Sequence, residues 1–261
     1  MTELLESHAG AAGLGAVLLR PIRAHAFEMC VERLAAAIRL GVYPSGSPLP
    51  PERDLAARLG VSRATLREAI AALRSAGMVS TTRGRGGRTT VAYTLPEPGT
   101  PGPGWVAERR SELVESLAFR RIVEPGACYV AACRSLEPED SERLVQCERE
   151  VREAPDNAAH RQADSRLHLA IAAASGSRML IEAVTDVQSA LHEMLLAIPV
   201  LGRNITHSSR QHSAIVSAIL KHHPEAARRA MEQHCDDTAA LLSGLLGLPV
   251  DEHTTTPVEG S

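Results

Sequence analysis

The sequence predicts a mainly helical protein in which a small basic module precedes a larger, acidic, all-helical one. Three observations support this fold class. Aromatic residues make up only 2% of the 261 residues, whereas strands draw on aromatic and β-branched side chains. Apolar residues recur at helical spacing along most of the chain. A stretch dense in Pro and Gly at 95–106 predicts a linker that divides the two modules.

The N-terminal module, residues 18–94, follows a Gly- and Ala-rich segment at 1–17 that is predicted to be a flexible tail. Its helices are predicted over 23–40, 51–60 and 63–76, and a glycine follows or ends each of the three segments. Two short β-prone runs, MVSTT and TTVAY, flank the basic, Gly-rich RGRGGR, which predicts a hairpin with a basic tip. This order of elements is typical of a winged helix-turn-helix.

The helix 63–76 is apolar on one side and basic on the other. Ser62 is a natural N-cap for it. Arg63 and Arg67 stand four residues apart, opposite a stripe of Leu66, Ala69, Ile70 and Leu73. The second helix of a helix-turn-helix enters the major groove, where arginines contact phosphates and guanine edges. A DNA-reading helix is therefore predicted, with an ordinary solvated basic face as the alternative.

Charge is divided unevenly along the chain. Residues 18–95 hold 12 arginines and five acidic residues, a net charge of +7, while the remainder carries −10 and the whole chain −3. A basic module joined to an acidic one predicts that only the first part meets a polyanion. A single lysine, Lys221, stands among the 28 basic residues.

The C-terminal module, residues 107–247, is predicted to be an antiparallel helical bundle, and residues 248–261 a disordered tail. Its helices are predicted at about 108–134, 138–153, 157–174, 177–198, 206–222 and 224–246. No apolar run reaches the roughly 20 residues of a membrane helix. The acidic start lacks the pattern of a secretory signal, and the five cysteines show no CxxC spacing, so a cytoplasmic protein with reduced thiols is expected.

Polar residues fall on helix faces of the bundle that should be buried. Asp164 and His168 are four residues apart on one face, and His212 and His234 share apolar stripes of the last two helices. A buried carboxylate and three imidazoles are costly unless something pairs them, and together they form a good ligand set for zinc and its first-row neighbours. Histidines satisfied within the core remain the alternative.

Residues 47–91 resemble the DNA-binding domain of the GntR superfamily of bacterial transcription regulators. The resemblance is carried by LPPERDLAARLGVSR, LREAI and the Gly-rich wing. It implies that DNA contacts come from Arg53, Arg63, Thr65, Arg67, Arg83 and Gly84. Ala64 stands where many members of the family have proline, and this difference affects the start of the helix only slightly.

Residues 107–243 resemble the all-helical ligand-binding domain of FCD type found in the FadR subfamily. The matching stretches are ADSRLHLAIAAASGSRML and RQHSAIVSAILKHHPEAARRAMEQH. The resemblance implies a divalent metal held by Asp164, His168, His212 and His234. Zinc is expected, with nickel or manganese as alternatives. It also implies a small carboxylate bound with the help of Arg120, for which an ion pair with Glu124 is the alternative role.

Together these observations predict a ligand-responsive repressor that binds a pseudo-palindromic DNA operator and is not an enzyme. The family resemblance implies that it is a homodimer. Two other functions remain open at this stage. One is a DNA-binding regulator whose polar cluster is purely structural, with no effector. The other is a metal-dependent hydrolase fused to a DNA-binding domain, although no HExxH motif accompanies the histidines.

Overall fold

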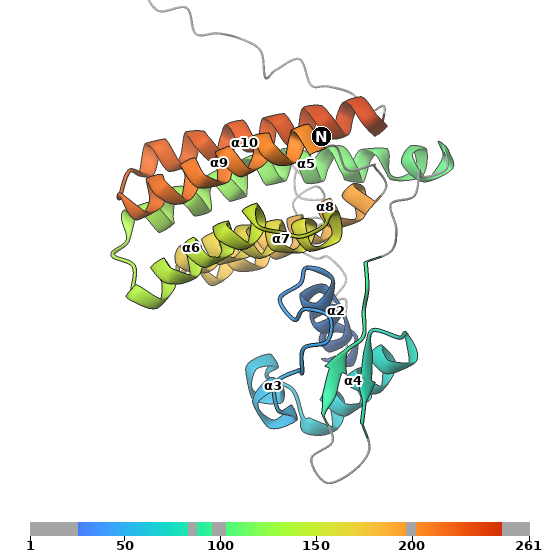
Figure 1. The fold of residues 1–261 in the computed structure, drawn as a ribbon. Helices are drawn as coiled ribbons and strands as arrows, with labels where there is room; N and C mark the ends of the chain where they lie inside the picture. Colours follow the sequence, from blue (N-terminus) through green and yellow to red (C-terminus); the bar gives the residue numbers. More distant parts are fainter. Residues whose placement is uncertain (1–25, 83–87, 96–102, 197–201, 247–261) are drawn as a thin grey trace, which may run out of the picture.

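The computed structural model describes residues 26–82, 88–95, 103–196 and 202–246 (Figure 1). The predicted tails at 1–17 and 248–261 lie outside these residues. The mainly helical fold class is confirmed, with a winged helix-turn-helix followed by a helical bundle. None of the described helices combines the length and the apolar character needed to cross a membrane.

The N-terminal module contains three helices and a two-stranded sheet. The helices are α2 (Ala26–Arg39), α3 (Glu52–Leu59) and α4 (Arg63–Ser75). Strands β1 (Val79–Thr81) and β2 (Thr89–Val91) pair antiparallel, with Val79 opposite Val91. Leu34, Ile38, Leu66 and Leu73 pack with both of these valines in one core. The apolar stripe predicted on α4 is therefore its buried face.

The segment before α3, which the sequence indicates only as turns, forms a further edge of the sheet. The N–H of Leu49 donates to the carbonyl of Thr89 at 2.9 Å, and the N–H of Val91 donates to the carbonyl of Ser47 at 2.9 Å. Both edges of β2 are thus hydrogen-bonded, which fixes the base of the wing.

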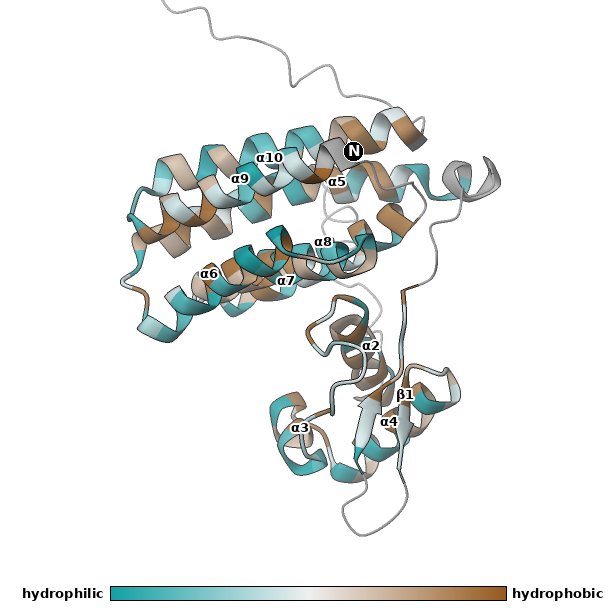
Figure 2. Cartoon of the chain, in the orientation of Figure 1, coloured by the Kyte–Doolittle hydropathy of each residue, from teal (hydrophilic) through white to brown (hydrophobic). Residues whose placement is uncertain are grey.

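The C-terminal module is a bundle of long helices in two layers. Its elements are α5 (Pro103–Cys133), α6 (Pro138–Arg152), α7 (Asn157–Ala174), α8 (Arg178–Leu196), α9 (Gly202–Leu220) and α10 (Pro224–Leu246). Figure 1 shows α5, α9 and α10 in one layer and α6, α7 and α8 in the layer beside the N-terminal module. Figure 2 shows the apolar residues of these helices alternating with hydrophilic stretches, as amphipathic helices require. An exposed turn with Lys221 joins α9 to α10.

Two helices of the bundle start earlier than the sequence predicts. Helix α5 begins at Pro103, inside the stretch 95–106 predicted to be a linker, because proline has the backbone angle of a first helical turn and needs no N–H partner there. Helix α9 begins at Gly202 rather than near residue 206. The ends of the other four helices agree with the prediction to within two residues over the part that the structure describes.

The two modules touch at the end of α2. The side-chain amide of Gln162 on α7 lies 3.4 Å from the carbonyl oxygen of Arg39, and Nη1 of Arg166 lies 3.4 Å from that of Gly41. Arg166 is itself held by Glu150 of α6 at 2.8 Å. Gly41 has a φ of +74°, and a Cβ built there would lie 2.7 Å from Cβ of Gln162. The backbone of the N-terminal module therefore approaches α7 as closely as a glycine allows.

A candidate metal centre and a candidate nucleic-acid interface

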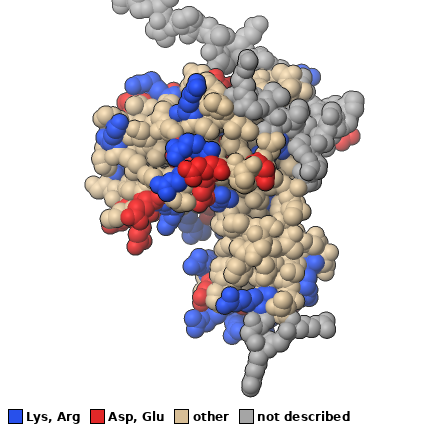
Figure 3. All heavy atoms as spheres, in the orientation of Figure 1, with Lys and Arg blue, Asp and Glu red and all other residues tan. Residues whose placement is uncertain are grey.

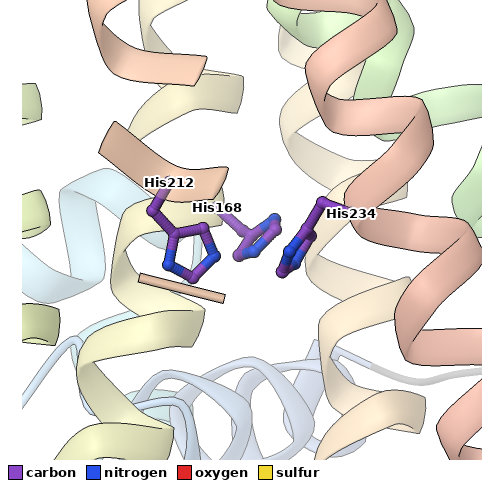
Figure 4. Close-up of side chains that lie close together, drawn as sticks. All are labelled: His168, His212 and His234. Atoms are coloured by element: carbon purple, nitrogen blue, oxygen red, sulfur yellow. The ribbon is translucent and has the colours of Figure 1, made fainter. Parts of the chain in front are cut away.

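Three histidines from three helices meet in the middle of the bundle. His168 comes from α7, His212 from α9 and His234 from α10, and their rings face one another (Figure 4). The ring centroids are 4.6 to 5.4 Å apart, and one nitrogen from each ring falls within 4.8 Å of the others. All three side chains are buried. The structure thus brings together three of the four residues that the sequence indicates as metal ligands.

Asp164, the fourth predicted ligand, lies at the edge of this cluster. Its Oδ1 is 3.4 Å from Nε2 of His212, and its Oδ2 is 3.9 Å from Nε2 of His168. The i, i+4 spacing on α7 places this carboxylate beside His168, as predicted. The Nε2 atoms of both histidines face the same carboxylate.

A buried polar group from α5 completes the surroundings of His168. Nδ1 of His168 lies 2.9 Å from Oε2 of Glu124, close but not aligned well enough for a regular hydrogen bond. Arg120 donates from Nε to the same carboxylate at 3.1 Å, and Gln188 of α8 donates to Oε1 at 2.6 Å. The ion pair of Arg120 with Glu124, the alternative role considered for this arginine, is therefore formed.

The charges of this cluster follow from burial and from its neighbours. Burial lowers the pKa of His212 to about 4, although Asp164 acts in the opposite direction. Burial also holds the pKa of His234 well below its usual value. Burial is the largest single influence on Glu124 and raises its pKa, but Arg120, His168 and Gln188 together outweigh burial and lower the pKa, so this carboxyl stays ionised. His212 and His234 are thus neutral at neutral pH, the form in which imidazole binds metals.

Several buried polar atoms of the cluster have no hydrogen-bond partner within the described part of the chain. They include both ring nitrogens of His212, Nε2 of His168 and Nη1 of Arg120. Buried polar atoms are nearly always satisfied, and leaving one unpaired costs about 1–3 kcal/mol. The ring nitrogens fit a divalent cation with imidazole and carboxylate ligands, and the arginine atom fits an anion.

Basic side chains are exposed on the part of the N-terminal module that lies away from the bundle, where Figure 3 shows several of them in blue. Arg63 is the first residue of α4, and its side chain is exposed. Arg67 is also exposed and contacts Oε2 of Glu52 at 2.7 Å, and Arg53 contacts Asp54 at 3.2 Å. These ion pairs hold two arginines at the surface without burying them.

The start of α4 is fixed by its cap. Ser62 has an extended backbone, and its Oγ accepts a hydrogen bond from the N–H of Thr65 at 3.0 Å. Thr65 is half-buried, and its hydroxyl lies 2.9 Å from the same oxygen. The N-terminus of α4, the end that enters a groove in this fold, is therefore well defined. Arg83 and Gly84, the predicted contacts of the wing, lie outside the described residues.

Sequence reasoning missed the outer residues of the histidine cluster. The sequence indicates Glu124 only as a partner of Arg120, and its position next to His168 depends on the packing of α5 against α7. No pattern in the sequence indicates Gln211, yet its Oε1 lies 3.1 Å from Nδ1 of His234. The only sequence signal for Gln211 is that it precedes His212.

Comparison with family models agrees with this division of the chain. Residues 27–89 match the model of bacterial regulatory proteins of the gntR family. Residues 115–237 match the FCD domain. The two matches coincide with the N-terminal module and with the central part of the bundle, including all four predicted metal ligands.

Curated relatives and one solved structure resemble the chain over most of its length. The HTH-type transcriptional repressor NanR of Cronobacter sakazakii is 30% identical, covering 84% of this chain and 85% of that protein. The Glc operon transcriptional activator of Escherichia coli K12 is 29% identical, covering 79% and 85%. The structure of E. coli McbR/YncC has the same fold, with a TM-score of 0.52, 19% identity and coverage of 85% and 99%.

Proposed function

The chain belongs to the GntR family of bacterial regulatory proteins and is a DNA-binding transcription regulator with an FCD domain, and from this premise we propose that it is a repressor controlled by a small carboxylate at a metal centre. The matched families and relatives are transcription regulators rather than enzymes, in agreement with the expectation from the sequence. The metal, the carboxylate and the direction of control are parts of the proposal.

The observation that carries the proposal is the group of buried, unpaired nitrogens in the bundle. His168, His212 and His234 would hold a divalent metal, with Asp164 as a fourth ligand. We expect zinc, with nickel or manganese as alternatives, because imidazole suits all three. Bound there, the cation would supply a positive charge to which a carboxylate can bind. Arg120, with Nη1 unpaired, would bind the same anion from α5.

Metal content and thermal stability test this centre together. Purified protein is expected to carry one divalent ion per chain, and His212→Ala is expected to lose most of it. Melting temperature is then measured against a set of small mono- and dicarboxylates, with and without chelator. A ligand that binds the folded state raises the melting temperature by mass action. Unchanged metal content in His212→Ala, or a protein without metal, would leave the histidines as a structural cluster.

DNA recognition is proposed to rest on Arg53, Arg63, Thr65 and Arg67, with Arg83 and Gly84 in the wing. An arginine contact to a guanine edge contributes about 1–3 kcal/mol, so Arg63→Ala or Arg67→Ala is expected to weaken operator binding about 5- to 150-fold. The operator is first selected from random DNA with the wild-type protein. Arg143→Ala, an exposed arginine on α6 of the bundle, is the charge-matched control and is expected to bind as wild type. Normal binding by Arg63→Ala would disprove the assignment of α4.

The assembly is proposed to be a homodimer on a pseudo-palindromic operator. Two copies would place their α4 helices in successive major grooves, so that half-sites lie one helical turn apart. Analytical sedimentation measures the number of chains in the free protein and the number bound to the selected DNA, and two chains are expected in each case. Expression of the controlled gene is expected to rise when this protein is deleted; a fall would identify an activator, the role named for the Glc operon relative.

A further inference from the structure

Gln211 links the histidine cluster to a polar network on its outer side. Its side-chain nitrogen donates to Oδ2 of Asp237 at 2.7 Å. A carboxylate only accepts, so this contact fixes which end of the amide faces Asp237. The oxygen of Gln211 therefore faces Nδ1 of His234, at 3.1 Å.

This orientation determines the tautomer of His234. An amide oxygen can only accept, so Nδ1 of His234 must carry the proton. The lone pair of the neutral ring is then on Nε2. His168 is placed in the same sense, because Nδ1 lies against the carboxylate of Glu124 while Nε2 is directed toward Asp164.

Both acceptors are themselves held in place. Glu124 accepts hydrogen bonds from Arg120 and Gln188, and all three side chains are buried. Asp237 orients Gln211 through Oδ2, and His207 contacts the same oxygen at 2.8 Å, whereas Gln233 donates to the other oxygen, Oδ1, at 2.8 Å. Neither acceptor is free to rotate away from its histidine without breaking other hydrogen bonds.

We propose that Gln211 and Glu124 are positioning residues of the metal centre, which hold the Nδ1 sides of His234 and His168 so that Nε2 of each ring is presented to the cation. The proposal rests on the metal centre proposed above and names the residues that set its affinity. Partners of this kind fix ring orientation and raise the basicity of the ligand, and their loss typically lowers metal affinity 10- to 100-fold.

The chain offers a matched pair of variants. Gln211→Ala removes the amide that contacts His234. Gln233→Ala is the control, because Gln233 precedes His234 in the sequence and also donates to Asp237. Its described hydrogen bond goes to Asp237 and not to the ring of a histidine. Zinc affinity is measured for the full-length variants by competition with a chromophoric chelator. We expect a 10- to 100-fold weaker affinity for Gln211→Ala and a change below about twofold for Gln233→Ala.

A second readout separates positioning from a general effect on folding. Nitrogen-15 NMR of the histidine rings in chelated protein is expected to show His168 and His234 protonated at Nδ1. In Gln211→Ala the His234 signal is expected to move toward a mixture of tautomers, while that of His168 stays unchanged. Glu124→Gln is expected to move the His168 signal toward a mixture of tautomers while that of His234 stays unchanged. If Glu124→Gln does not fold because Arg120 loses its charged partner, the Gln211 variants still decide the matter.

The outcomes distinguish the two proposals. If the wild type binds no zinc, nickel or manganese, the metal centre itself is disproved. If the wild type binds zinc and Gln211→Ala binds it equally well, or Gln233→Ala loses as much affinity, the positioning role is disproved while the centre stands. A wild-type His234 protonated at Nε2 in the chelated protein would also overturn it.

Discussion

One buried histidine near the junction of the two modules, His192, makes the stability of the folded protein depend on pH. His192 is buried on α8, and its Nε2 has no hydrogen-bond partner within the described residues. Burial lowers its pKa to about 4, and the charges of Arg39 and Arg161 act in the same direction. The ring is therefore neutral in the folded protein and takes up a proton on unfolding at mildly acidic pH.

The sign of this effect follows from proton linkage. The unfolded value is about 6.5, so between about pH 6.5 and pH 4 the unfolded chain binds more protons. The free energy of unfolding is expected to fall through this range by about 2–3 kcal/mol on account of His192. His192→Leu should remove this part of the decline in urea titrations at pH 7 and pH 4.5. His223→Leu, at an exposed position, should keep it, and a His192 variant with the wild-type decline would refute the assignment.

At this scale the sequence predicts the inner residues of the site better than the outer ones. Asp164 and His168 are linked by helical spacing alone, so their proximity follows from the pattern. Glu124 and Gln211 reach the histidines from other helices, and their contacts depend on how α5, α7, α9 and α10 cross. Single-helix periodicity carries no information on that crossing.

Among the elements, α4 has the clearest local cause. Ser62 caps its first turn by accepting the N–H of Thr65, while Ser75 in its last turn donates to the carbonyl of Ala71 at 3.1 Å. The first bond satisfies a backbone N–H that has no partner within the helix. The second goes to a carbonyl that already accepts a backbone N–H within the helix. The Ser62 hydrogen bond therefore stabilises the helix, whereas the Ser75 hydrogen bond supplies no missing partner.

We expect Ser62→Ala to destabilise the N-terminal module by about 1 kcal/mol, because a lost N-cap costs this much. Ser75→Ala, the matched control at the other end, should change stability by less than about 0.5 kcal/mol. Denaturant unfolding followed by helical circular dichroism measures both. Equal losses in the two variants would show that the cap contributes nothing particular to α4.

Element boundaries show where sequence patterns lose their power. Ser62 and Gly60 mark the turn before α4 correctly, because N-caps and left-handed glycines act locally. The pairing of Ser47 and Leu49 with β2 is not visible in the sequence, since prolines and glycines there indicate only turns. The early start of α5 at Pro103 is not predicted either, because a proline indicates the end of a helix unless it is known to lie in the first turn.

In the molecule as a whole, α7 contacts both the proposed metal centre and the N-terminal module. Helix α7 carries Asp164 and His168 on the side of the proposed metal centre, and Gln162 and Arg166 beside the end of α2. Figure 1 shows α7 in the layer of the bundle next to α2. A ligand changes the placement of two domains only through a difference in its affinity for the two arrangements. Helix α7 therefore directly connects the proposed metal centre to the end of α2.

Gly41→Ala tests the contact. Its new Cβ would lie 2.7 Å from Cβ of Gln162, whereas a Cβ on Gly77, which has the same sense of φ at +73°, meets nothing within 4 Å. Both changes should cost about 1 kcal/mol for the left-handed backbone. Only Gly41→Ala is expected to speed hydrogen exchange of the amides at 39–47 in the full-length protein. Similar exchange in both variants would show that the modules do not rely on this contact.

The lone lysine has a practical consequence. Acetylation neutralises lysine side chains and leaves arginine charged, so acylation of side-chain amines cannot weaken the electrostatics of the proposed DNA-reading face, whose basic residues are all arginines. Lys221 lies in the exposed turn between α9 and α10, in the C-terminal module. Apart from the α-amino group, a reagent that attacks amines finds this one side chain. Immobilised or dye-labelled through it, the protein would keep α4 free to search DNA.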